Sequence, residues 1–244
     1  MKENIKSDFY YKWKNKKIYI YAMLFMVIYI LATSIGNIEW KSSQTLYSVF
    51  TLMVNQQYLM IMIVLLGMTC YYQGKMFENR LLMYQIVSHG RIETVLSKYI
   101  AQSFFNVVFF SSSIFLAMIF LCNVYQVQFQ MDIKILVLYL FLVMLIIRYT
   151  VRLVSIVYFT KNGIVGGLIT WFIVVAELMP HLIGREYSIS ELVDFAKYFL
   201  PGQINSLAMG ENLAGTALII LITTSIEMGV EIFGVIKKSR DEMF

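Results

Sequence analysis

Six long apolar runs constrain the fold of this chain more than any other feature of its sequence. The runs are residues 18–34, 47–72, 99–124, 133–157, 164–179 and 213–236. A helix needs roughly 20 apolar residues to cross the hydrocarbon of a bilayer. With 59% hydrophobic and only 14% charged residues, the chain also lies far from soluble domains. We predict an all-α polytopic membrane protein with six transmembrane helices, forming a single domain of residues 1–244.

The basic residues predict how these spans are oriented. They gather in the N-terminal segment, in residues 73–98, after the fourth span and at the C-terminus, leaving outside only Lys41, Lys134, Arg185 and Lys197. Loops rich in Lys and Arg face the cytoplasm, so we expect both termini and the 73–98 loop to lie there. The net charge of +5 sits at span ends rather than on one face, which argues against a nucleic-acid partner.

Residues 1–17 carry six lysines around an apolar stripe. Ile5, Phe9 and Trp13 recur every four residues and therefore share one helical face. This pattern predicts an interfacial helix in the headgroup layer of an anionic leaflet. The alternative, a solvated tail, exposes the aromatic side chains to water.

The 73–98 loop contains a stretch, 75–88, that reads as a short helix closed by Gly90. Its apolar residues form two faces beside Arg80: Phe77, Leu81 and Tyr84 on one, and Met76, Met83 and Val87 on the other. We infer that one face rests on the bundle and the other on a partner. A helix lying on the inner leaflet is the alternative.

Residues 180–212 form an external segment, after a fifth span that we expect to end at Pro180. Ser188 and Glu191 have the spacing of a capping box, and the helix they begin should stop at Pro201-Gly202. Such an amphipathic helix forms a lid, dips back into the bundle, or lies on the outer leaflet.

Charged residues within the spans are costly unless they are paired or hydrated. At ~1.5 Å per residue, Arg148 and Glu227 lie at matching depths in the fourth and sixth spans, and Arg152 and Glu231 repeat the match one turn deeper. We predict ion pairs Arg148–Glu227 and Arg152–Glu231. The alternative for the second pair is that both side chains snorkel to the inner interface.

Other polar or small residues in the spans suggest a cavity and a close helix contact. Asn55, Gln56 and Gln57 cannot all face one neighbouring helix, so some should meet a cavity or the lid, unless interhelical hydrogen bonds absorb them. Glu177 is expected to face solvent or the external segment. Gly163 and Gly167 let the fifth span approach another helix, and its own copy at a dimer seam is one candidate.

Catalytic motifs are missing from the sequence. It has no GxSxG or HExxH, and the Gly74-Lys75 pair lacks the upstream glycine of a phosphate-binding loop. His89 and His181 stand apart, without the clustering of a metal site. We therefore expect no enzyme activity, metal or cofactor in this chain, and any ATP-driven transport needs a separate motor.

The whole chain resembles the permease subunit of an ABC-2-type exporter. The likeness rests on the basic lead-in DFYYKWKNKK, the six spans, FENRLLMYQIVSHGRIETVLSKYI between spans two and three, the sequence YFLPGQI, and the basic tail FGVIKKSRDEMF. In that family the helix between spans two and three docks on the ATPase. The resemblance implies that the docking side chains are Phe77, Glu78, Arg80, Leu81, Tyr84 and Val87.

The resemblance also implies partners and a location. It implies two ATPase subunits that hold ATP and Mg, a second permease copy in a homodimer or related heterodimer, and a bacterial plasma membrane. The cargo would be an amphipathic peptide or lipid-like molecule, as in peptide export or antimicrobial-peptide resistance. Two alternatives remain: a motor-independent immunity protein that sequesters a membrane-active peptide, and a membrane enzyme using Glu177 or Glu227.

Overall fold

The chain folds into a bundle of helices in a computed structural model that describes residues 2–14, 16–36, 45–78, 85, 90–127, 133–209 and 213–241. No strand occurs within these ranges. The helices are α1 (Lys2–Lys14), α2 (Lys16–Gly36), α3 (Leu46–Glu78), α5 (Arg91–Tyr125), α6 (Ile133–Thr160), α7 (Gly163–Glu186), α8 (Ser190–Ala196), α9 (Leu200–Met209) and α10 (Leu213–Asp241).

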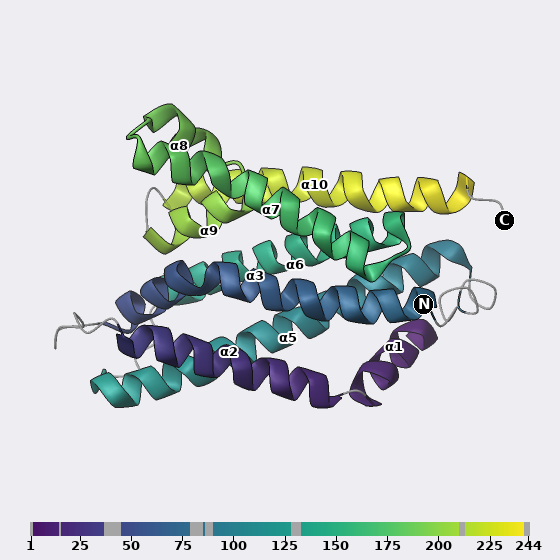
Figure 1. The fold of residues 1–244 in the computed structure, drawn as a ribbon, viewed down its shortest axis with the longest axis horizontal. Helices are drawn as coiled ribbons and strands as arrows, with labels where there is room; N and C mark the ends of the chain where they lie inside the picture. The colour runs from purple at the N-terminus through teal and green to yellow at the C-terminus, as the bar shows by residue number, and fades with distance from the viewer. Residues whose placement is uncertain are drawn as a thin grey trace.

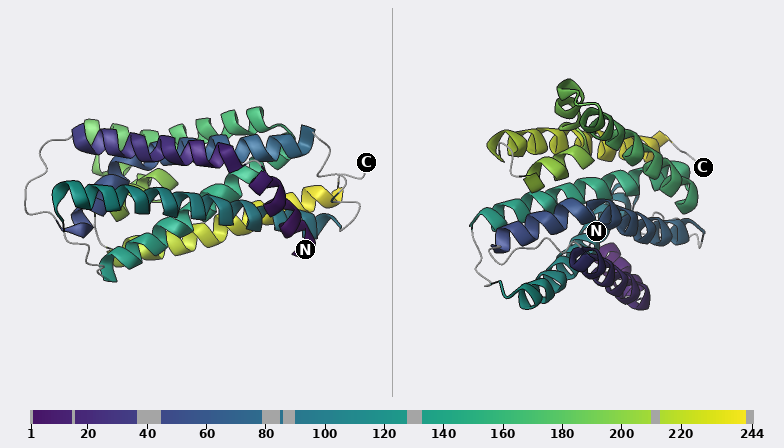
Figure 2. Two further views of the ribbon diagram at one scale, coloured as in Figure 1. Left: turned by 90° about the horizontal axis from the view of Figure 1, so that it is seen from below. Right: turned by 60° about the vertical axis from the view of Figure 1, so that its left-hand side comes forward.

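The long helices run side by side, with both chain termini at the same end of the bundle, which we call the terminal end (Figures 1 and 2). Helices α3 and α6 form the centre: α6 packs against α3, α5, α7, α9 and α10, and α3 also packs against α2. Helices α7, α8, α9 and α10 lie on one side of this pair, and α1, α2 and α5 lie on the other (Figure 1).

Five helices in the described ranges are long and apolar enough to cross a membrane. Their apolar portions are Met60–Glu78, Ile92–Val124, Ile133–Thr160, Gly163–Glu186 and Ala214–Lys238. Helix α2, where we predicted the first span, contributes a shorter apolar stretch, Tyr19–Tyr29. The all-α fold is therefore confirmed for the described residues, and the five long apolar helices are compatible with a membrane protein. The arrangement of six spans stays a prediction.

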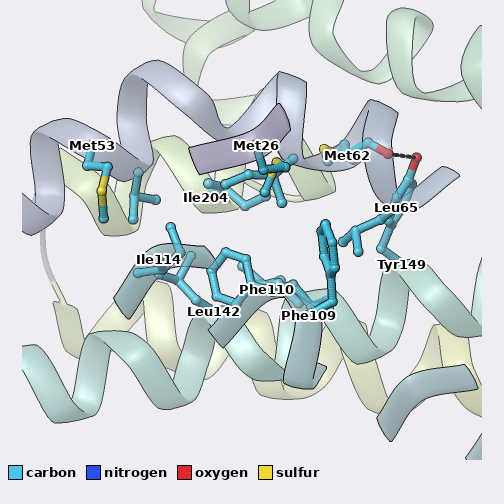
Figure 3. Close-up of a cluster of buried hydrophobic side chains, with 14 of the residues drawn as sticks. Met26, Met53, Met62, Leu65, Phe109, Phe110, Ile114, Leu142, Tyr149 and Ile204 are labelled. Carbon is cyan, nitrogen blue, oxygen red and sulfur yellow. Dashed lines mark hydrogen bonds between the residues drawn. The ribbon is translucent and has the colours of Figure 1, made fainter. Parts of the chain in front are cut away.

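The apolar core lies between α3, α5 and α6, with α2 and α9 closing it. Phe110, Leu142 and Ile204 are buried there, and the Tyr149 hydroxyl donates a hydrogen bond to the Met62 carbonyl at 3.1 Å (Figure 3). Lipid tails are as apolar as these side chains, so in a membrane this core is stabilised by close packing rather than by leaving water.

Two predicted helix ends are wrong because tertiary packing extends the helices. Helix α3 continues from the predicted span directly to Glu78. Helix α7 continues through Pro180 to Glu186. Its last turns pack against α8, where a Cβ on Gly184 would lie 2.8 Å from the Val193 side chain. Proline is tolerated inside membrane helices when neighbouring helices pack around it.

Pro201-Gly202 begins a helix instead of ending one. The predicted external helix is two helices: α8 begins at Ser190 without a side-chain cap, and α9 begins at Leu200. Proline fits the first turn of a helix, since its fixed φ is already helical and the first N–H groups have no partner there. Helix α9 turns back into the bundle, where Gln203 and Leu207 are fully buried.

Candidate functional site

The candidate site is a group of ionised side chains inside the bundle, which we call the arginine network. It consists of Arg148 and Arg152 on α6, Glu177 on α7, Glu227 and Glu231 on α10, and the polar partners Gln203 and Thr223. Arg148 and Arg152 are 4% and 5% exposed. A buried charge that lacks a partner destabilises a fold strongly, so the contacts of each arginine decide what the network does.

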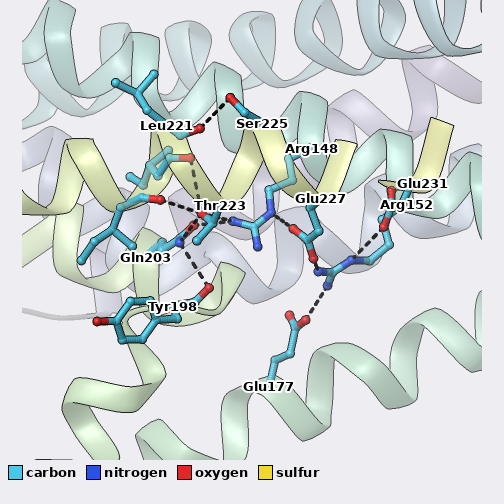
Figure 4. Close-up of polar contacts among 12 residues, drawn as sticks. Arg148, Arg152, Glu177, Tyr198, Gln203, Leu221, Thr223, Ser225, Glu227 and Glu231 are labelled. Atoms are coloured by element: carbon cyan, nitrogen blue, oxygen red, sulfur yellow. Dashed lines mark hydrogen bonds and ion pairs between the residues drawn. The ribbon is translucent and has the colours of Figure 1, made fainter. Parts of the chain in front are cut away.

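Arg148 ties α6 to two other helices. Its Nε pairs with Glu227 Oε2 on α10 (Figure 4). A second guanidinium nitrogen donates to Gln203 Oε1 on α9 at 2.6 Å and to the Thr223 hydroxyl on α10 at 3.1 Å. The five donors of a guanidinium suit it to hold several partners at once.

Arg152 holds three carboxylates at once. It pairs with Glu227 Oε1, donates to Glu177 Oε1 at 2.7 Å, and lies 3.6 Å from Glu231 Oε1 (Figure 4). Both predicted pairs, Arg148–Glu227 and Arg152–Glu231, are therefore present. Glu227 uses one oxygen for each arginine and so bridges them.

The expectation for Glu177 is wrong, because this side chain reaches Arg152 instead of solvent. Counting residues from the ends of helices places Glu177 and Arg152 at different depths. The count ignores the tilt of α7 and the length of the two side chains, which together close the gap. As a result, α7 is joined to α6 and, through Arg152, to α10.

Sequence reasoning missed Gln203, although it completes the network. Its amide nitrogen donates to the Thr223 hydroxyl at 2.9 Å and to the Tyr198 carbonyl at 3.3 Å, while its oxygen accepts from Arg148. Only the return of α9 into the bundle brings it there. The sequence shows a polar residue directly after Pro-Gly within an apolar stretch, but this pattern does not say where the helix that follows packs.

A second buried polar group, which we call the lysine cluster, joins α1 to α5. Lys98 pairs with Asp8, and Lys12 Nζ donates to Gln102 Oε1 at 2.6 Å. Burial lowers the pKa of Lys12 to about 7; Asp8 opposes this shift and Lys98 adds to it. With this lowered pKa, Lys12 loses its proton near neutral pH instead of near pH 10.

Hydrogen bonds continue from the lysine cluster to α6. Gln102 donates to Asn106 at 3.0 Å and to Thr69 at 3.2 Å. Asn106 in turn donates to Thr150 at 2.9 Å. Thr150 lies on α6 between Arg148 and Arg152, so this helix carries one polar group on each side.

The lysine cluster lies on the face of α1 that packs against α5, and the placement of α1 in the headgroup layer stays a prediction. The prediction turned Ile5, Phe9 and Trp13 toward the membrane. In the structure the buried stripe is Asn4, Asp8 and Lys12, also four residues apart, and Trp13 is 67% exposed. This face of α1 packs against α5 because polar side chains on α5 form hydrogen bonds and ion pairs with the polar groups that become buried there.

Of the six side chains expected to dock on an ATPase, the structure describes two. Phe77 packs edge-on against Tyr158 of α6, with ring centroids 5.7 Å apart, so it belongs to the bundle. Glu78 is exposed at the end of α3. Arg80, Leu81, Tyr84 and Val87 lie outside the described residues, as do the side chains of Asn55, Gln56 and Gln57 on α3.

Gly163 and Gly167 serve a contact inside the chain, which corrects their assignment to a dimer seam. A Cβ on Gly163 would lie 2.9 Å from the Gly74 Cα, and one on Gly167 would lie 3.2 Å from the Cys70 sulfur. Both neighbours belong to α3. The small residues let the backbones of α7 and α3 approach closely.

Two further features bear on the chemistry of the site. A cavity of about 320 Å³ lies between α3, α5 and α6, with Phe50, Phe115, Leu136 and Tyr139 in its mainly apolar lining. Among the residues that the structure describes, no group of three His, Cys, Asp or Glu side chains is arranged to hold a metal ion.

Comparison with known proteins found no matching family model, no similar curated protein and no similar solved structure.

Proposed function

We propose that the protein is the membrane-spanning permease subunit of an ATP-driven exporter. It moves an amphipathic peptide or lipid-like cargo out of the cytoplasm or out of the membrane, with energy from a separate ATPase subunit. The observation that carries this proposal is the arginine network beside the returning helix α9. Each ionised side chain within hydrocarbon costs roughly 2.5–3.5 kcal/mol, and such groups mark transport pathways.

Short helices that turn back inside the membrane support the same proposal. Transporters use interrupted helices where polar groups must face a substrate path, because only protein or water can satisfy the freed backbone there. Helix α9 brings Gln203 to Arg148, so the cargo path would pass along α6, α9 and α10. The network would then move these helices together.

The conformational change driven by ATP would be transmitted to the permease at the end of α3 that carries Glu78. With 33 residues, α3 is ~50 Å long at 1.5 Å per residue, which exceeds the ~30 Å of hydrocarbon. Its last residue, Glu78, is exposed and precedes the 79–89 connection. We propose that this connection lies in the cytoplasm and docks on the ATPase, in an assembly of two ATPases and two permease copies.

Purification from the native membrane tests the proposal. The tagged protein, extracted in a mild detergent, should carry an ATP-binding-cassette protein in stoichiometric amount. Glu78→Arg should reduce that amount several-fold without changing the yield of the membrane protein. Glu186→Arg is the matched control. Glu186 is also exposed, and it lies at the last residue of α7, at the opposite end of the bundle from Glu78.

A protein that protects cells against membrane-active peptides, yet carries no ATPase and tolerates Glu78→Arg, would contradict the proposal. That outcome identifies a motor-independent immunity protein that sequesters the peptide. Loss of protection in Arg148→Gln, with an unchanged yield, would tie the activity to the network in either case.

A further inference from the structure

The arginine network has more acidic than basic groups. Its two guanidiniums face three carboxylates, on Glu177, Glu227 and Glu231. With all five groups ionised, the network would hold one excess negative charge among membrane-spanning helices. Low-dielectric surroundings penalise such a charge, and a carboxyl group avoids the penalty by keeping its proton.

The contacts show which of the three carboxylates interacts most weakly with an arginine. Glu227 has an arginine on each oxygen, and Glu177 accepts from Arg152 at 2.7 Å. Glu231 has only the 3.6 Å contact, which is longer than a hydrogen bond. Its side chain is 20% exposed, so a proton can reach it.

Within the described ranges, the groups recorded around Glu231 include no further cation that balances the excess charge. Around it, α6 contributes Arg148 and Arg152, α5 contributes the phenol of Tyr99, and α7 contributes Glu177. Glu227 of α10 shares Arg152 with it. The polar neighbour from α9 is the neutral amide of Gln203. Within the described part of the chain, Glu177 Oε2 is also buried and accepts no hydrogen bond.

We infer that Glu231 binds one proton in this arrangement and that its ionisation is a switch in the bundle. Protonated, it leaves a network of two guanidiniums and two carboxylates with no net charge. When the proton leaves to water, the Glu231 carboxylate competes for Arg152. Glu177 is then the partner most easily released, because Glu227 is held by both arginines. Loss of the proton therefore loosens α7 from α6 and α10.

This inference does not depend on the proposed function, because a protein without a motor would carry the same proton. Infrared difference spectra of the full chain in lipid nanodiscs test it directly. Between about pH 5 and about pH 9, a window that spans the ordinary and raised range of glutamates, the wild type should lose one carboxylic-acid band. Glu231→Gln should abolish that band, and the control Glu186→Gln at the exposed end of α7 should retain it.

Three results would overturn the inference. One is a wild-type spectrum with no titrating carboxylic-acid band, which is decisive even if Glu231→Gln fails to fold. A second is a band that survives in a folded Glu231→Gln protein. A third is a band that disappears in Glu177→Gln but not in Glu231→Gln, because the proton would then belong to α7.

Discussion

The arginine network and the lysine cluster lie on opposite sides of α6 and solve the same problem in different ways. Both bury charge, but the network joins four helices through guanidiniums, while the cluster docks one short helix through ammonium groups. A guanidinium keeps its charge at every accessible pH, whereas a buried lysine gives up its proton. The comparison teaches that the arginines of the network stay charged at every accessible pH, whereas the charge of Lys12, and with it the docking of α1, depends on pH.

Removing Arg152 should disrupt the arginine network with the largest effect. Arg152→Leu leaves Glu177 and Glu231 without a cation, and breaking a buried ion pair costs about 3–5 kcal/mol. We expect a large fall in the yield of monodisperse protein in detergent. Lys237→Leu, at an exposed position near the end of α10, should behave like the wild type. Equal losses in both variants would contradict this role of Arg152.

Exchanging the charges of Arg148 and Glu227 tests how much the bridge from Glu227 to Arg152 contributes to stability. A simple pair would be restored by Arg148→Glu with Glu227→Arg. Glu227 also bridges to Arg152, so the new arginine would meet a like charge. We expect the double variant to recover only about 1–2 kcal/mol of the stability lost in the single variants, measured by thermal unfolding. Full recovery would show that the bridge to Arg152 is unimportant.

Neutralising Asp8 should release α1 while leaving the rest of the bundle folded. Asp8→Asn removes the carboxylate from beside Lys98 and costs about 1–3 kcal/mol, but undocking of α1 lets water reach the lysines. The effect should appear as faster limited proteolysis near residue 15. The control is Asp194→Asn on α8, which should leave the cleavage rate unchanged.

A change of one pH unit should have the smallest effect. Lys12 has a pKa of about 7 when docked and 10.5 ordinarily, so between these values the docked state binds fewer protons. Docking of α1 should therefore strengthen as pH rises through this window, by at most about tenfold per pH unit, and stay constant below it. Limited proteolysis at several pH values measures this, and Lys12→Met should reduce the dependence.

The sequence predicts those features of the structure that have a local cause, and it misses those that depend on how distant segments pack. The rise per residue is nearly constant, so matched depths were enough to pair Arg148 with Glu227 and Arg152 with Glu231. Gln203 was missed because its position depends on α9 turning back, which no local pattern specifies. The buried stripe of α1 had a visible signal, since Asn4, Asp8 and Lys12 also recur every four residues.

The close contact between Gly74 and Gly163 has a mechanical consequence for α3. Gly74 lies four residues from the Glu78 end, or ~6 Å, and 28 residues from the Leu46 end, or ~42 Å at 1.5 Å per residue. If α3 turned there as a rigid rod, the glycines would act as a fulcrum between a short arm and a long one. A small displacement at Glu78 would then become one roughly seven times larger beside Leu46.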